Sequence, residues 1–594
     1  MRLPTLILAT ILATLMPTAW AAESLLQPGD WQMGLRVPMR DGIVLVGDLL
    51  LPSAPGRYPT IFEFTPYGRG ADKLNFRNEA EFWVQHGYAF MVVDTRGQSD
   101  SGGHFGFFID TQADGYDLVG WIARQSWSNA RVGMRGASYT GVDQWYVARS
   151  RPPALKCIAP NSTLARPMEE VPYQGGVFVF GWAINWIAHL SDAGVKTDKP
   201  IDYQALLGRR PLNRLDEVVY GKPLALYRKF LEHPTLDSYW QTMQFDKADF
   251  TRLTLPTFGS TGWFDGTQPG TVFFYEGMKQ HSSVPQDQFL VIGPWEHANT
   301  SDGGYDYLTN QPRRKLGDLE FPDNAFFEGK ELARQFFDWC LKDGPRFKQP
   351  SARVYITGSN RWLDFDTYPP RSTVTSLYLA SGGHANGMEG DGRLVWKASS
   401  ARKVDRYVYD PMHPVSSMPP GTNQPLGLMG NPIDLKPLLD RPDVLAFLSD
   451  PLDKPLTILG NVRMTLYASS DARDTDFMSQ IEDVGPDGKA VKLGSTNGAM
   501  IRARYRLGYD REVLLTPNEP TKFDLDYFDI GHTFLKGHRI RVTVTSSAYP
   551  WAFPNPNTGN PIATDTAEPR KAQQTVFHDA SRPSQLLLPV IATP

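Results

Sequence analysis

Cysteine is scarce in this chain: only Cys157 and Cys340 occur among its 594 residues. Two cysteines do not make a disulfide scaffold, and without histidines at ligand spacing they do not make a zinc site. An exported protein could pair them, but two buried free thiols agree equally well with the sequence. Collagen, coiled coil and multi-span membrane proteins are also excluded, because 41% hydrophobic and 21% charged residues are typical of a folded globular protein.

An excess of charge of one sign is missing as well. The formal net charge is −4 and the Lys and Arg residues are dispersed, so nucleic acid is not expected as a partner. Neither a P-loop nor a GxGxxG pattern marks a phosphate site. Asp471, Asp474 and Asp476 lack the Gly and the terminal Glu of a calcium loop, so we expect them in turns and caps and predict no metal site.

The N-terminus has the pattern of a signal peptide. Arg2 is followed by the apolar residues 6–16, a stretch too short to span a bilayer, and then by Ala19-Trp20-Ala21. We predict cleavage after Ala21 and a periplasmic or secreted protein with no membrane span once the leader is removed. A retained N-terminal anchor is the alternative.

Two patterns of hydrophobicity follow the leader. Residues 31–51 alternate around Arg40-Asp41-Gly42, which predicts an antiparallel hairpin. From residue 60, apolar runs are interleaved with helix-like stretches, which indicates a parallel sheet covered by helices on both faces. The expected strands are 60–64, 89–93, 131–134, 155–159, 256–260 and 288–292, and two of the helices are 112–123 and 331–341.

The pattern changes twice more along the chain. Strand signals disappear between residues 162 and 249, where aromatic residues stand at helix-compatible spacings, so we predict an inserted helical cap over the end of the sheet. After Gly344, short alternating strands are broken by Gly, Pro, Asn and Asp, which predicts a C-terminal jelly-roll β-sandwich. The expected strands of this last region are 354–356, 376–379, 462–467, 523–528 and 540–546.

The strongest local motif is Gly136-Ala-Ser138-Tyr-Thr-Gly141. A predicted strand runs into it and helix-compatible residues 142–149 follow at once, which is the context of a nucleophile elbow. The second Gly of the usual G-x-S-x-G is replaced by Thr140, and Gly141 comes one residue later. We predict that Ser138 is a nucleophile; a purely structural turn is the alternative.

An elbow serine needs an acid and a base, which follow it along the chain in the order Asp or Glu, then His. Asp265 and His297 each follow an apolar strand, and strand ends are where such sheets place catalytic groups. An Asp-Gly alone is usually only a turn. His281 lies in a polar helix end or loop, where solvation is the simpler interpretation.

The oxyanion formed in the reaction needs hydrogen-bond donors. The backbone N–H of Tyr139 follows from the elbow geometry, and the phenol of Tyr67, in the loop after residues 60–64, is the predicted second donor. Phe178, Trp182 and Trp186 in the cap are candidates for a substrate pocket, with a place in the core as the alternative.

Together these motifs resemble the cocaine esterase and X-Pro dipeptidyl-peptidase (S15) family. The resemblance is carried by Thr-Pro-Tyr67, Val93-Asp94-Thr-Arg96-Gly97, the Ser138 motif, Gly262-Trp-Phe-Asp265-Gly and Gly293-Pro-Trp-Glu-His297, and it continues through Tyr467-Ala-Ser-Ser-Asp471 and Asp526-Tyr-Phe528. It implies an α/β-hydrolase domain with a helical cap and a C-terminal jelly roll, a triad of Ser138, Asp265 and His297, and an oxyanion hole shared by Tyr67 and the backbone of Tyr139. The family cleaves esters and amides of hydrophobic acyl groups without any cofactor.

We therefore expect a serine hydrolase that acts through an acyl-enzyme on a small-molecule ester, or a weak amide, with an apolar or aromatic acyl group. The expected boundaries are 1–21 for the signal peptide, 22–161 and 250–350 for the α/β-hydrolase domain, 162–249 for the cap and 351–594 for the jelly roll. Nothing in the sequence indicates the oligomeric state.

Two other functions stay open. X-Pro peptidases and α-amino acid ester hydrolases bind a substrate ammonium, the latter with acidic residues, but the loop after Asp265 reads Gly-Thr-Gln-Pro-Gly and supplies none. Glu169-Glu170 is the nearby candidate, and we expect it on a solvated helix face. The remote alternative is a catalytically silent carbohydrate-binding protein, since a jelly roll alone does not determine function.

Overall fold

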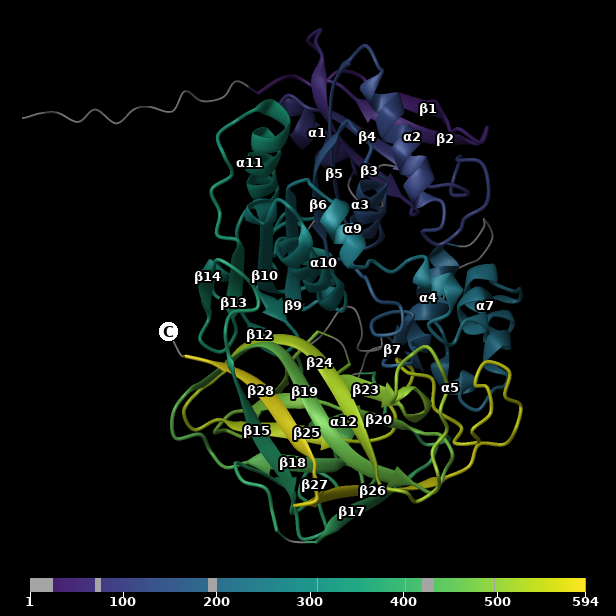
Figure 1. Ribbon diagram of the computed structural model, residues 1–594, viewed down its shortest axis with the longest axis vertical. Coiled ribbons are helices and arrows are strands. Elements are labelled where there is room, and N and C mark those ends of the chain that lie inside the picture. The colour runs from purple at the N-terminus through teal and green to yellow at the C-terminus, as the bar shows by residue number, and fades with distance from the viewer. Residues whose placement is uncertain are drawn as a thin grey trace, which may run out of the picture.

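The computed structural model describes residues 25–69, 76–190, 200–306, 308–400, 402–418, 432–495 and 497–592. The predicted signal peptide and its cleavage site lie outside these residues. Within them, no helix is long and apolar enough to cross a membrane. Figure 1 shows a sheet with its helices at the top, a large β-sandwich at the bottom, and a group of short helices beside them.

A ten-stranded sheet forms the upper part, in the order β1-β2-β4-β3-β5-β6-β9-β10-β13-β14. β1 (Gln32–Pro38) and β2 (Val44–Leu50) are the predicted antiparallel hairpin, and the strands from β4 to β13 in this order run parallel. The predicted parallel strands are confirmed as β3 (Tyr58–Thr65), β4 (Ala89–Asp94), β5 (Ser128–Ala137), β6 (Leu155–Asn161), β9 (Thr257–Phe264) and β10 (Gln288–Glu296).

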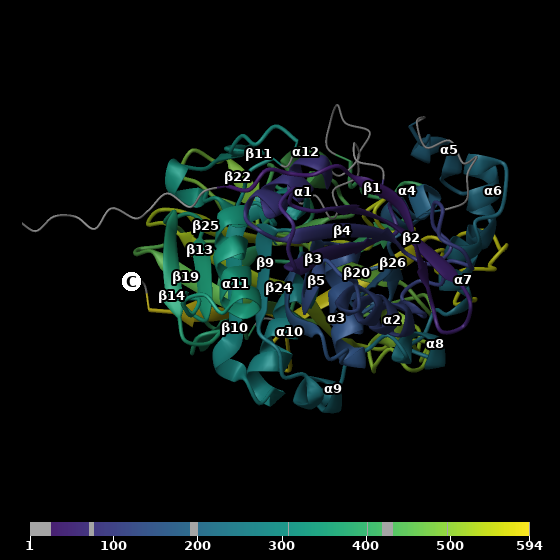
Figure 2. The same cartoon turned by 90° about the horizontal axis from the view of Figure 1, so that it is seen from above.

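Helices cover both faces of this sheet, as Figure 2 shows from above. Met91 and Val93 of β4 belong to the hydrophobic core under one group of helices, whereas Phe90 and Val92 belong to the core under the other. Because successive side chains point to opposite faces and both faces are buried, the strands are apolar throughout. The first group is α2 (Thr111–Ala123), α3 (Tyr139–Ser150) and α10 (Gln268–His281), and the second is α1 (Phe76–Gln85) and α11 (Gly329–Lys342).

The two cysteines form a disulfide between β6 and α11. The Cα atoms of Cys157 and Cys340 are 6.4 Å apart, within the range that a disulfide requires. Of the two possibilities that the sequence left open, the structure therefore has the paired one, and the bond fastens α11 to the sheet.

The prediction that residues 354–356 belong to the β-sandwich is wrong. They lie in β13 (Ala352–Ile356), which runs parallel to β10, and β14 (Arg361–Phe365) closes this edge of the central sheet. No residue of β14 is fully buried, because an edge strand keeps part of its surface in solvent. β13 itself pairs antiparallel with β14, and a short antiparallel pair is compatible with a sandwich as well as with the edge of this sheet. The central sheet therefore extends beyond residue 350.

The inserted segment between β6 and β9 is mainly helical, as predicted, but it begins with a small hairpin of β7 (Tyr173–Gln174) and β8 (Val177–Phe178). Two-residue strands are too short to show a period of two. The helices of this cap are α4 (Phe180–Leu190), α5 (Tyr203–Leu206), η1 (Leu212–Arg214), α6 (Leu215–Tyr220), α7 (Ala225–Glu232), α8 (Ser238–Gln241) and α9 (Lys247–Arg252).

The C-terminal part is the predicted β-sandwich. Its long strands β19 (Leu456–Ser470) and β24 (Thr521–Phe534) pair antiparallel along most of their length. The other strands are β15 (Thr373–Ala380), β16 (Arg393–Val395), β17 (Val404–Tyr409), β18 (Leu445–Ser449), β20 (Asp476–Ser479), β21 (Ile481–Val484), β22 (Ala490–Lys492), β23 (Ala499–Arg502), β25 (Arg539–Val544), β26 (Ala572–Asp579), β27 (Arg582–Pro583) and β28 (Gln585–Ile591). The short elements not yet named are β11 (Lys315–Leu316), β12 (Leu319–Glu320), α12 (Lys436–Leu439), η2 (Pro285–Asp287), η3 (His297–Asn299), η4 (Asp323–Ala325) and η5 (Ala503–Tyr505).

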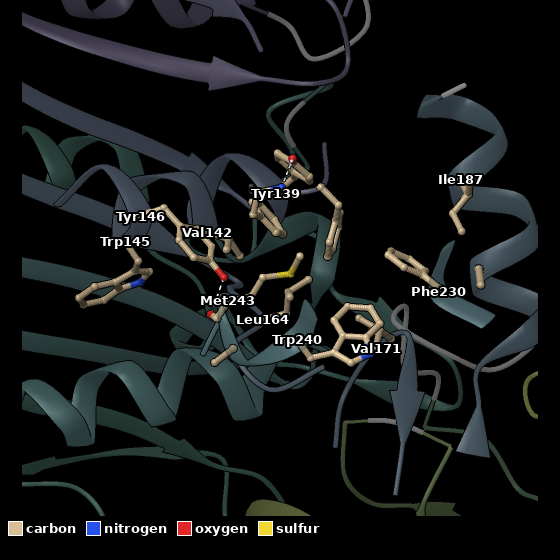
Figure 3. Packing of buried hydrophobic residues seen from close by; sticks show 14 of the residues in the cluster. Tyr139, Val142, Trp145, Tyr146, Leu164, Val171, Ile187, Phe230, Trp240 and Met243 are labelled. Carbon is tan, nitrogen blue, oxygen red and sulfur yellow. Dashed lines mark hydrogen bonds between the residues drawn. The ribbon is translucent and has the colours of Figure 1, made fainter. Parts of the chain in front are cut away.

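One hydrophobic cluster joins the three parts of the molecule. Figure 3 shows Tyr139 and Tyr146 of α3 in the same cluster as Ile187, Phe230 and Trp240 of the cap. The cluster continues into the β-sandwich through Met500, Tyr549, Trp551 and Phe553. The cap is therefore packed against both of its neighbours.

Candidate active site

Ser138 lies at the turn between β5 and α3. Its backbone has φ 60° and ψ −125°, a combination that non-glycine residues rarely adopt and that stores strain. Its N–H donates to the carbonyl oxygen of Asn161 at 3.0 Å, and its own carbonyl oxygen accepts the N–H groups of Gly141 and Val142, also at 3.0 Å. The half-buried side chain thus stands at the N-terminal end of α3, where the helix dipole favours negative charge. This is the geometry of a nucleophile elbow.

The displaced glycine of the elbow motif has a steric explanation. A Cβ atom on Gly141 would lie 2.5 Å from the carbonyl oxygen of Asn161 and 2.9 Å from Cγ2 of Thr163, so α3 could not approach the chain after β6 as closely. Thr140 has no such restriction, and its hydroxyl donates to the carbonyl oxygen of Ala137 at 2.9 Å.

Asp265 follows β9 directly and is completely buried. Its Oδ1 accepts hydrogen bonds from the N–H and the hydroxyl of Thr267, both at 2.9 Å, and its Oδ2 accepts one from the hydroxyl of Thr261 at 2.7 Å. Burial by itself raises the pKa of this carboxyl, but His297 and these hydrogen bonds outweigh burial and hold the pKa below its ordinary value of 3.8. Asp265 is therefore charged at neutral pH.

His297 begins η3, just beyond the end of β10. Its Nδ1 lies 2.7 Å from Oδ1 of Asp265, and the side chain is 12% exposed. Burial lowers the pKa of the imidazole, but the carboxylates of Asp265 and Glu296 outweigh burial and raise the pKa above its ordinary value of 6.5. Because Nδ1 faces the carboxylate, Nε2 is the nitrogen left to exchange a proton.

The elbow and the loop of His297 lie at the same end of the sheet, because both follow the carboxyl ends of parallel strands. Asn161, whose backbone holds Ser138, is linked through its side chain to β9: its Oδ1 lies 2.8 Å from the hydroxyl of Ser260. The same hydroxyl lies 2.7 Å from the carbonyl oxygen of Thr300, in the loop of His297. His281, in contrast, is the last residue of α10, and because α10 connects the parallel strands β9 and β10, it ends near the strands' amino ends, away from the site.

Tyr67 lies in the loop after β3, the strand next to β5. Burial raises the pKa of its phenol, although hydrogen bonds with Trp186, the Ser138 side chain and the backbone of Tyr139 act in the opposite direction. The phenol therefore keeps its proton at neutral pH, and it lies beside the Ser138 side chain, where it can donate to an oxyanion. Tyr139 is the first residue of α3, and first-turn N–H groups have no partner inside their helix.

Aromatic side chains of the cap reach this site. Nε1 of Trp186 lies 3.4 Å from the Tyr67 hydroxyl, and its ring centroid is 6.2 Å from that of Tyr139. Trp182 stacks on Trp186 at a centroid distance of 4.7 Å, and both rings keep part of their surface exposed. Phe178 is completely buried beside Tyr227, so its ring is part of the core of the cap.

Neither glutamate of the Glu169-Glu170 pair lies on a freely solvated face, so that expectation is wrong. Glu170 is 1% exposed and accepts the backbone N–H groups of Ala165 and Arg166 at 3.2 and 3.0 Å. Glu169 is paired with the Arg166 guanidinium at 2.7 Å. Both carboxylates are therefore engaged inside their own segment.

Of the three aspartates expected in turns and caps, Asp471 and Asp474 lie in the bend between β19 and β20, whereas Asp476 is the first residue of β20. Asp474 and Asp476 are completely buried and form ion pairs of 2.9 Å with Arg504 and Arg502. Sequence spacing did not reveal these partners because Arg502 follows Asp476 by 26 residues, in β23, and Arg504 follows Asp474 by 30 residues, in η5.

The hydroxyl groups that hold the Asp265 carboxylate were not predicted from the sequence. Thr261 and Thr267 lie four residues before and two residues after Asp265. The second spacing carried a usable signal, since an Asp side chain that accepts the N–H two residues on forms a common local turn.

At the carboxyl ends of the parallel strands, the structure thus has an elbow serine and a histidine paired with a buried carboxylate. This combination defines a serine hydrolase of the α/β-hydrolase fold. Comparison with known proteins agrees with this class. Residues 41–299 match the X-Pro dipeptidyl-peptidase (S15) family, and residues 346–587 match the X-Pro dipeptidyl-peptidase C-terminal non-catalytic domain. The chain belongs to this family of serine hydrolases.

Several relatives are similar over almost the whole chain. Cocaine esterase of Rhodococcus sp. (strain MB1 Bresler) is 32% identical over 93% of this chain and 97% of its own length. The crystal structure of an aminopeptidase from the marine sediment archaeon Thaumarchaeota archaeon superposes with a TM-score of 0.82 at 25% identity, covering 98% of this chain and 99% of that one. An α-amino acid ester hydrolase gives a TM-score of 0.81 at 25% identity, with 98% and 100% covered.

Proposed function

We propose that this protein hydrolyses carboxylic esters, and weak amides, whose acyl group is apolar or aromatic. The observation that carries the proposal is the aromatic surface of Trp182 and Trp186 beside Tyr67 and the elbow serine, with no acidic residue in the loop that follows Asp265. Such a surface suits an uncharged acyl group. The similarity to cocaine esterase supports an ester substrate.

In this proposal the reaction begins with attack of the Ser138 hydroxyl on the ester carbonyl carbon. Nε2 of His297 takes the serine proton, and Asp265 holds Nδ1 and stabilises the imidazolium that forms. The tetrahedral oxyanion accepts hydrogen bonds from the Tyr67 phenol and the Tyr139 N–H. When the intermediate collapses, His297 returns the proton to the leaving alkoxide and the acyl group stays on Ser138.

The second half of the reaction repeats these steps with water. His297 takes a proton from a water molecule, whose oxygen attacks the acyl carbonyl, and the same two donors hold the second oxyanion. Collapse breaks the bond to Ser138, and the proton on His297 returns to the serine oxygen. The carboxylic acid then leaves.

Substrates that carry a free amine are the second candidate, because the aminopeptidase and the α-amino acid ester hydrolase have the same fold. Recognition of an ammonium would require a carboxylate that is free to pair with it. Glu170 is occupied by backbone N–H groups, and Thr267 and Gln268 follow Asp265. These residues favour the neutral acyl group.

We also propose that the protein works in the periplasm or outside the cell. The Cys157–Cys340 disulfide supports this, because structural disulfides persist in oxidising compartments. The signal-like N-terminal sequence points the same way.

Initial rates on a neutral phenylacetyl ester and on an alanyl-proline anilide test the proposed substrate class. The protein without its leader and its Ser138→Ala variant are compared side by side. We expect ester turnover that is lost in the variant and no cleavage of the anilide. Cleavage of the anilide that depends on Ser138 would show that the protein acts on amine-bearing substrates instead. Full ester turnover by the Ser138→Ala variant would refute the assignment of Ser138 as the nucleophile.

A further inference from the structure

The turn of the β7–β8 hairpin, at the beginning of the cap, packs closely against the β-sandwich. Gly175 has φ +57°, and a Cβ atom there would lie 1.9 Å from the carbonyl oxygen of Met500, so no other residue fits this contact. The Arg502 N–H donates to the carbonyl oxygen of Gly175 at 2.9 Å. Nε2 of the neighbouring Gln174 donates to the carbonyl oxygen of Gly498 at 2.7 Å. Backbone and side chain of the hairpin are thus both held by the chain around β23.

β23, the strand that contacts the hairpin, is itself held in place by its neighbour β20. β23 pairs antiparallel with β20, and Arg502 lies directly opposite Asp476. Two hydrogen bonds of 2.9 Å join the Arg502 guanidinium to the Asp476 carboxylate, and both residues are buried. A buried bidentate ion pair has one favourable geometry, so the seat of the hairpin is well defined.

A second attachment lies where α4 begins. The Gly181 N–H donates to the carbonyl oxygen of Pro550 at 2.8 Å, and the Phe553 N–H donates to that of Phe178 at 3.3 Å. The rings of Phe180 and Phe553 meet edge to face with centroids 5.5 Å apart. The β-sandwich therefore holds the first turn of the helix that carries Trp182 and Trp186.

The two tryptophans are placed by this helix. Trp182 and Trp186 are four residues apart and lie on one face of α4. Towards the hydrolase domain, α4 is joined by the 3.4 Å contact of Trp186 with Tyr67 and by a 3.0 Å hydrogen bond from Gln98 to the carbonyl oxygen of Leu190. The hairpin and the first turn of α4 are thus held by backbone contacts with the β-sandwich, whereas the rest of α4 contacts the hydrolase domain through the side chains of Trp186 and Gln98.

We propose that the β-sandwich positions the cap: by seating the Gly175 hairpin and the start of α4, it fixes Trp182 and Trp186 above the nucleophile and sets which acyl groups are accepted. Gly175 and Gln174 are then positioning residues for acyl selectivity, although they lie outside the hydrolase domain and carry no reacting group. The statement about acyl groups rests on the function proposed above; the statement about the position of α4 does not.

The test compares Gly175→Ala with a matched control, Gly221→Ala. Gly221 ends α6 in the same cap and has φ +71°, but a Cβ atom there would meet no atom within 4 Å. Both variants force Ala into the left-handed region, and only Gly175→Ala also pushes against β23. Gln174→Ala is the milder second variant, since it removes the hydrogen bonds of this side chain with Gly498 and with Nε1 of Trp551, both in the β-sandwich, without adding an atom.

Each folded variant is assayed on an acetyl ester and on a phenylacetyl ester with the same leaving group. We expect Gly175→Ala to raise KM for the phenylacetyl ester by about tenfold or more, because loss of apolar contacts with a bound group has effects of this size. KM for the acetyl ester and kcat for both esters should stay close to the parent values, since Ser138, Asp265 and His297 are untouched. Gln174→Ala should raise the ratio of the phenylacetyl-ester KM to the acetyl-ester KM by a smaller factor than Gly175→Ala does. Gly221→Ala should leave this KM ratio unchanged.

Hydrogen exchange of residues 180–190 gives a readout that needs no activity. We expect faster exchange in α4 of Gly175→Ala and Gln174→Ala, and parent rates in Gly221→Ala and in α3 of every variant. If folded Gln174→Ala shows parent rates of hydrogen exchange in α4 and a parent ratio of the two KM values, the positioning role is overturned. A parent protein that cleaves no ester, but whose variants show the exchange difference, would refute the proposed function and leave the positioning of α4 supported.

Discussion

Replacing Asp265 by Asn tests the role of the buried carboxylate. Oδ1 faces three donors, the Nδ1–H of His297 and the N–H and hydroxyl of Thr267, whereas Oδ2 faces only the hydroxyl of Thr261. A hydroxyl can rotate to accept a hydrogen bond, but an N–H cannot. The Asn side chain should therefore place its oxygen at the Oδ1 position and its NH₂ group towards Thr261, which preserves the tautomer of His297.

What Asp265→Asn removes is then mainly the charge that stabilises the imidazolium. Two unit charges about 4 Å apart interact by about 4 kcal/mol at an effective dielectric constant of about 20. That energy corresponds to a loss of about 10³-fold in kcat. An inverted tautomer would cost about 10⁴-fold, so the size of the loss distinguishes the two outcomes.

The assay is kcat on a phenylacetyl ester between pH 5 and 9, with folding checked by circular dichroism. The carboxylate of Asp265 raises the pKa of His297, so its removal should also move the acidic limb of the rate profile to lower pH. Asp364→Asn is the control, because Asp364 is half-exposed on the edge strand β14 and pairs only with Arg353 there. A loss smaller than about tenfold with an unmoved limb would refute the assigned role of Asp265.

Three further predictions concern pH and stability. In the parent protein kcat/KM should be half-maximal above pH 6.5, because the raised pKa of His297 keeps the base protonated below that pH; a midpoint below 6.5 would contradict this. Replacing Cys157 and Cys340 together by Ser should cost about 5 kcal/mol of unfolding free energy in urea, because the bond closes a loop of 183 residues. Burial raises the pKa of Glu276 to about 7 at the contact of α10 with β24. Protonation of Glu276 therefore stabilises the native state at low pH and this contribution is lost as the pH rises through 7, so Glu276→Gln should flatten the fall in stability between pH 5 and 8.

The parts of the fold that could be predicted from the sequence are those that depend on residues close together along the chain. Strands buried on both faces, such as β4 and β10, are nearly continuous apolar runs, without the polar residues that recur along one side of a surface helix. Ser138 is visible because an elbow needs a strand before it and a helix after it, and Asp265 and His297 are visible because they end strands in the required order.

The parts that sequence could not predict depend on partners distant along the chain. The burial of Asp476 is explained by Arg502 and the pairing of Cys157 by Cys340, and neither partner is marked by spacing. Residues 354–356 were expected in the sandwich because the parallel pairing of β13 with β10, a strand distant along the chain, has no local signal. The seat of Gly175 on the Met500 carbonyl is likewise a contact between two domains, where a Gly-Gly pair alone predicts only a turn.

Trapping the acyl-enzyme tests the assignment of Ser138 as the nucleophile most directly. The protein without residues 1–21 is mixed with an activated aryl ester, quenched in acid within the first turnover, digested and analysed by mass spectrometry. We expect the acyl group on the peptide that contains Ser138, and no acylated peptide in Ser138→Ala. Turnover of the ester with the acyl group on another residue, or the same labelling in Ser138→Ala, would contradict the assignment.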